Sequence, residues 1–99
     1  MDLLGEVAYM LSQDVDRLLG QIRDGVARKD CKAVESAAHQ LKGALSNFGP
    51  SAAVDAALGV EEAGRTEDLT DARQLCDSLR QEADRLTAFL LDLPKERAA

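Results

Sequence analysis

Apolar residues recur every three or four positions through most of this chain, which is the spacing of one face of an α-helix. The first such stretch covers about residues 3–27. The last begins near Asp68 and keeps a seven-residue repeat up to Pro94, a pattern typical of left-handed helix packing. Because proline lacks a backbone N–H, Pro94 is expected to end that helix. The pattern therefore predicts two long amphipathic helices, one at each end of the chain.

Two shorter helices are predicted between them. Asp30 suits the N-cap of the second helix, and Gly49 suits the C′ position at its end. Ser51 or Pro50 opens the third helix, and Gly64 closes it. The apolar stripe of the third helix consists of small residues, which allow a close approach to a neighbouring helix: Ala53, Ala57, Val60 and Ala63.

Four amphipathic segments with short connections favour an all-α fold, an antiparallel up-down-up-down four-helix bundle. We expect one domain over residues 1–94 and a frayed C-terminal tail over residues 95–99. Cys31 and Cys76 both fall on apolar stripes, so we expect them to be small buried residues with free thiols.

The composition agrees with a small folded domain. The chain has 99 residues, of which 45% are hydrophobic, and its net charge is −6. The acidic balance argues against nucleic acid or an anionic membrane as a partner. No apolar run approaches the ~20 residues of a membrane-spanning helix, so we expect a cytoplasmic protein. A monomer is expected, because one chain can bury all of its own stripes.

The only histidine, His39, falls outside the apolar face of the second helix. At about 100° per residue, it lies roughly 140° from the centre of that face, which predicts an exposed side chain. Lys42 and Gly43 follow one turn later. A neutral imidazole is a good nucleophile near pH 7, and a neighbouring lysine offsets the charge of an attached phosphoryl group. A glycine inside a helix costs about 1 kcal/mol relative to alanine, but here it leaves room for a partner.

Two other interpretations of this histidine follow from the residues alone. It could be one more polar surface residue, with Gly43 serving helix packing. It could also share a metal ion with Glu35, which stands four positions earlier, but two ligands do not make an adequate metal site. We therefore expect no metal here, and the residues alone leave the surface and phosphoryl interpretations equally open.

The segment Ala-His-Gln-Leu-Lys-Gly at residues 38–43, followed by Asn47 and Gly49, resembles the signature of histidine phosphotransfer (HPt) domains of two-component phosphorelays. Pro50 departs from the pattern, because the family commonly has a small residue there. The similarity extends from about Tyr9 to Leu90 and includes the pairs Ala37-Ala38 and Glu61-Glu62.

The resemblance implies that a phosphoryl group moves reversibly between a receiver-domain phosphoaspartate and His39. His39 would be the acceptor, Lys42 would stabilise the phosphoryl group, and Gly43 would admit the receiver. The resemblance also implies a phosphoryl carrier rather than an enzyme with its own catalytic cycle. Mg²⁺ is expected on the receiver, and no cofactor is expected on this chain. Further contact residues are expected by position: Glu35, Lys32, Gln40 and Ser46.

The expected partners are receiver domains of response regulators, of a hybrid histidine kinase, or of both. The chain starts nearly at its first long helix, so an alternative is a phosphotransfer domain excised from a hybrid sensor kinase. Another alternative is a bundle that docks receivers without being phosphorylated. An unrelated structural bundle would need a continuous apolar face on the second helix, which the spacing does not show.

Overall fold

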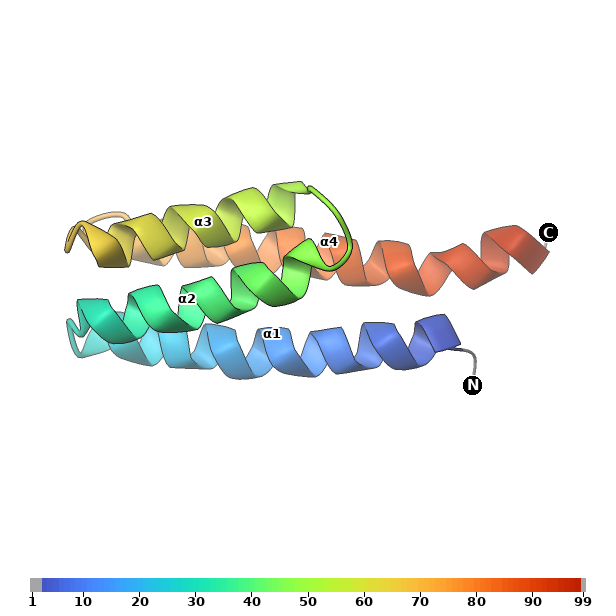
Figure 1. The fold of residues 1–99 in the computed structure, drawn as a ribbon, viewed down its shortest axis with the longest axis horizontal. Helices are drawn as coiled ribbons and strands as arrows, with labels where there is room; N and C mark the ends of the chain where they lie inside the picture. The colour runs from blue at the N-terminus through green and yellow to red at the C-terminus, as the bar shows by residue number, and fades with distance from the viewer. Residues whose placement is uncertain (1–2, 99) are drawn as a thin grey trace.

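The computed structural model describes residues 3–98, and within them the chain forms four α-helices and no strand. They are α1 (Leu3–Ala27), α2 (Cys31–Ser46), α3 (Ala52–Arg65) and α4 (Ala72–Ala98). The predicted all-α class is therefore confirmed. Figure 1 shows the long helices α1 and α4 side by side, with the shorter α2 and α3 packed along one part of their length. Within these residues, no helix is long and apolar enough to cross a membrane.

The two predicted helix starts are confirmed by their capping bonds. The Asp30 carboxylate accepts a hydrogen bond from the Ala33 amide at 3.1 Å, and the Ser51 hydroxyl accepts one from the Val54 amide at 3.3 Å. Such caps satisfy amide groups that have no partner inside the helix. At the end of α2, Asn47 is the C-cap, so Gly49 occupies the C″ position and not the C′ position predicted for it. Its φ of +89° explains why a glycine is found there.

Gly64 does not end the third helix, as the sequence had suggested. α3 continues to Arg65, and Gly64 is buried inside it. A Cβ atom on Gly64 would lie 2.6 Å from the Glu35 amide nitrogen and 2.8 Å from the Cys31 carbonyl oxygen. The glycine therefore serves a close backbone contact between α3 and α2, the kind of approach that the small residues of the third helix predicted.

Both predicted ends of the fourth helix were wrong. α4 begins at Ala72 rather than near Asp68, because the Asp68 carboxylate accepts a hydrogen bond from the Thr70 amide and holds a local turn. At its other end α4 continues past Pro94 to Ala98. Proline removes one backbone hydrogen bond and crowds the preceding turn, but its fixed φ is compatible with a helix. The division into a domain of residues 1–94 and a tail of residues 95–99 stays a prediction.

The core lies between the four helices and holds the apolar stripes. Both thiols are free and Cys76 is buried, as predicted, but Cys31 is only half-buried because it stands at the first residue of α2. The largest fully buried side chains come from all four helices: Leu19, Ile22, Leu41, Leu45, Leu79, Val15, Val34, Val60 and Cys76. α2 turns its own apolar side toward α1 and α3, and its opposite side therefore faces solvent.

Candidate functional site

His39 stands in the middle of α2 on the solvent side. Ala38 and Leu41 on the opposite side of the helix are fully buried, whereas Gln40 is exposed like His39. The His39 side chain is 68% exposed. The exposure predicted from the helical spacing is therefore confirmed, and the ring is accessible to another molecule.

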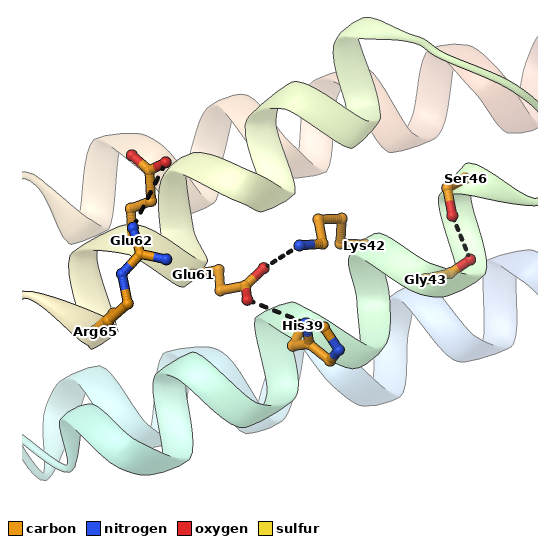
Figure 2. Close-up of polar contacts among 7 residues, drawn as sticks. All are labelled: His39, Lys42, Gly43, Ser46, Glu61, Glu62 and Arg65. Atoms are coloured by element: carbon orange, nitrogen blue, oxygen red, sulfur yellow. Dashed lines mark hydrogen bonds and ion pairs between the residues drawn. The ribbon is translucent and has the colours of Figure 1, made fainter.

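A glutamate from α3 meets this histidine. One carboxylate oxygen of Glu61, Oε2, lies 3.0 Å from Nδ1 of His39, and the other, Oε1, lies 2.7 Å from Nζ of Lys42 (Figure 2). The Glu61 side chain is only 11% exposed. A single buried carboxylate thus connects the imidazole and the ammonium group, which both project from α2.

The charge of Glu61 is maintained by these two neighbours. The pKa of Glu61 is lowered from its ordinary value, mainly by the hydrogen bond with Lys42 and further by the bond with His39, while burial opposes the shift. An ionised carboxylate can only accept hydrogen bonds, so Nδ1 of His39 is the nitrogen that donates. The neutral ring then keeps an unprotonated Nε2 with a free lone pair.

Lys42 lies one turn beyond His39 on α2. Its amino group turns toward Glu61, and its side chain is only 28% exposed. At Gly43, no atom from elsewhere in the described part of the chain lies within 4 Å of the position that a Cβ would occupy, and its role toward a receiver stays a prediction. Its carbonyl oxygen accepts a hydrogen bond from the Ser46 hydroxyl at 2.9 Å (Figure 2).

Three of the four predicted contact residues share one shallow, open depression with the histidine. Ser46 is exposed one turn beyond Gly43, outside that depression. The depression is lined by Lys32, Glu35, Ser36, His39, Gln40 and Glu61.

No group of three or more His, Cys, Asp or Glu side chains that could hold a metal ion occurs within the described part of the chain.

Comparison with known families identifies the family of this chain. A model of the Hpt domain family matches residues 6–89. The chain belongs to the Hpt domain family. Members of this family carry phosphoryl groups on histidine in phosphorelays, act as carriers rather than catalysts, and interact with receiver domains. Searches of curated proteins and of solved structures returned no match.

Glu61 is the residue of this Hpt domain site that sequence reasoning missed. In the sequence, the acidic pair Glu61-Glu62 stands out only through the family resemblance. A further signal was present, because Glu61 follows Ala57 by four residues and so falls beside the apolar stripe of α3. A charge at such a position needs a partner on the neighbouring helix. Glu62 points away and pairs with Arg65 at 3.8 Å (Figure 2).

Proposed function

We propose that this Hpt domain accepts a phosphoryl group on Nε2 of His39 from the phosphoaspartate of one receiver domain and passes it to another. The observation that carries the proposal is an exposed imidazole whose Nδ1 is held by a buried carboxylate. This arrangement leaves Nε2 as the free nucleophile. The same chemistry holds whether the receivers are separate proteins or belong to the same polypeptide.

The proposed step is a displacement at phosphorus. The Nε2 lone pair forms the N–P bond, the bond between phosphorus and the aspartyl oxygen breaks, and aspartate leaves as a carboxylate. Nδ1 keeps its proton, so the ring becomes positively charged when it takes the phosphoryl group. The Glu61 carboxylate, 3.0 Å from Nδ1, faces that new charge and favours it. We expect Mg²⁺ to be bound by the receiver and no cofactor by this chain.

The other residues have supporting roles in this proposal. Lys42 stabilises the phosphoryl group, and Gly43 leaves room for the receiver. Contacts with the receiver are assigned by position to Lys32, Glu35, Gln40 and Ser46. The helices follow an antiparallel up-down-up-down order in this proposal, supported by the short connections between them. The proposed protein is a cytoplasmic monomer, and the burial of the apolar stripes within one chain supports the monomer.

Transfer of label from phosphorylated receiver domains tests the proposal. Radiolabelled phosphate should appear on the chain in an acid-labile, alkali-stable form. It should be absent from His39→Gln and retained in Ser36→Ala, a change in the same depression. His39→Gln is expected to fold normally, because the side chain is mostly exposed. Failure of the wild-type chain to accept label from any of a broad panel of receivers would refute the proposal.

A further inference from the structure

Lys42 supplies a cation at the site, and the structure pairs it with Glu61. In the unphosphorylated protein, the ammonium group of Lys42 lies 2.7 Å from Oε1 of Glu61. Oε1 is shielded from solvent, and within the described part of the chain no group other than that ammonium compensates it. Its compensation is therefore the ion pair itself. Removing the partner of a buried carboxylate is strongly unfavourable, so Glu61 holds Lys42 while the histidine is free.

A phosphoryl group on His39 would change that balance. Residues three positions apart on a helix have neighbouring Cβ atoms, so the long Lys42 side chain can reach a group attached to the His39 ring. Lys42 is 28% exposed, which leaves its amino group free to rotate toward solvent without any change in α2. A phosphoryl group brings more negative charge than the single carboxylate of Glu61 and attracts the same ammonium group.

We infer that Lys42 is shared between these two anions: it neutralises Glu61 while His39 is free and moves to the phosphoryl group once His39 carries one. Through this competition, the charge of Glu61 weakens the contribution of Lys42 to phosphoryl retention. Glu61 is thus a positioning residue for Lys42, and its charge limits how strongly Lys42 holds the phosphoryl group. The inference rests on the proposed function.

A double-mutant cycle on the phosphotransfer equilibrium tests this inference. The protein is mixed with a receiver domain that exchanges phosphoryl groups with the wild type, and the ratio of phosphorylated Hpt domain to phosphorylated receiver is measured at equilibrium. The change Lys42→Gln is made in the wild-type and in the Glu61→Gln background. Glutamine at position 61 keeps an oxygen that can accept from Nδ1–H, so the cycle removes the charge and retains an acceptor.

Lys42→Gln should shift the phosphotransfer equilibrium more in the Glu61→Gln background than in the wild-type background. In the wild-type background, Lys42→Gln loses a contact in both states, so its effect on the equilibrium is small. In Glu61→Gln, Lys42 serves the phosphoryl group alone, and Lys42→Gln should reduce phosphorylated Hpt domain about five- to tenfold more than in the wild-type background. Glu62→Gln, which also removes one negative charge from α3, should leave the effect of Lys42→Gln unchanged.

Equal effects of Lys42→Gln in the two backgrounds, or a larger effect in the wild-type background, would overturn the inference and leave the proposed function intact. A wild-type chain that takes up no label refutes the proposed function instead. If Lys42→Gln does not fold, the wild-type protein still provides a test by NMR. Phosphorylation should weaken the nuclear Overhauser contacts between the Lys42 Hε and Glu61 Hγ protons, and unchanged contacts would overturn the inference.

Discussion

Replacement of Gly43 by alanine or glutamine should make the protein more stable and less active. Gly43 lies inside α2, is exposed, and has open space where its side chain would be. Within residues 3–98, nothing therefore opposes a side chain at this position. A glycine that contributes nothing to internal packing and weakens the helix is best explained by an approaching partner, since it stands one turn from the phosphoryl acceptor proposed here.

The magnitude on the stability side follows from helix propensity. Alanine in place of a helix-interior glycine stabilises by about 1 kcal/mol, and glutamine by somewhat less. For a domain of this size, that gain corresponds to a rise in Tm of about 4 to 8 °C. On the activity side, a side chain that holds the receiver backbone away should reduce the phosphotransfer rate constant at low receiver concentration about tenfold or more for glutamine, and less for alanine.

Gly20 provides a matched control, because it is an exposed glycine inside α1 that also has open space around its missing Cβ. Gly20→Ala and Gly20→Gln should raise Tm by a similar amount and leave phosphotransfer unchanged. The assay combines thermal unfolding followed by circular dichroism with single-turnover transfer from a phosphorylated receiver. Wild-type transfer rates in Gly43→Gln would refute the argument that Gly43 is kept open for the partner.

Two further predictions concern folding. Gly64→Ala should destabilise the protein by about 3 kcal/mol in urea unfolding, because the new Cβ would lie 2.6 Å from a backbone atom of α2. Gly59→Ala should be tolerated, because its new Cβ would lie 3.7 Å from the nearest neighbouring atom. Equal stability of the two variants would contradict the close contact at Gly64. The lowered pKa of Glu61 means that its ionised form stabilises the fold above the ordinary glutamate value of 4.5 and that this contribution is lost as the pH falls through the lower folded-state value. The free energy of unfolding should therefore fall less steeply below pH 4.5 in Glu61→Gln than in the wild type. Identical slopes in the two proteins would argue against an ionised, buried Glu61.

Much of the local structure could be predicted from the sequence, because the causes are local. A cap such as Asp30 or Ser51 acts within three residues of the helix start that it stabilises. The exposure of His39 depends only on its position relative to the apolar residues of its own helix. One prediction was wrong because a local signal had a different use in the packed protein: Gly64 was predicted to end the third helix, but it serves the contact with α2.

The sequence by itself thus determined that this protein is helical and that its only histidine faces solvent with Lys42 and Gly43 one turn away, because helical periodicity fixes which residues share a side. Only the tertiary structure decided what the imidazole and the lysine bind. Glu61 is 22 residues from His39 in the chain and reaches it because α3 packs closely against α2. Helical spacing within α2 carries no information about that contact, since the distance between two helices depends on the small residues at their interface. The nitrogen left free for chemistry and the partner held by Lys42 are therefore set by the packing of α3 on α2.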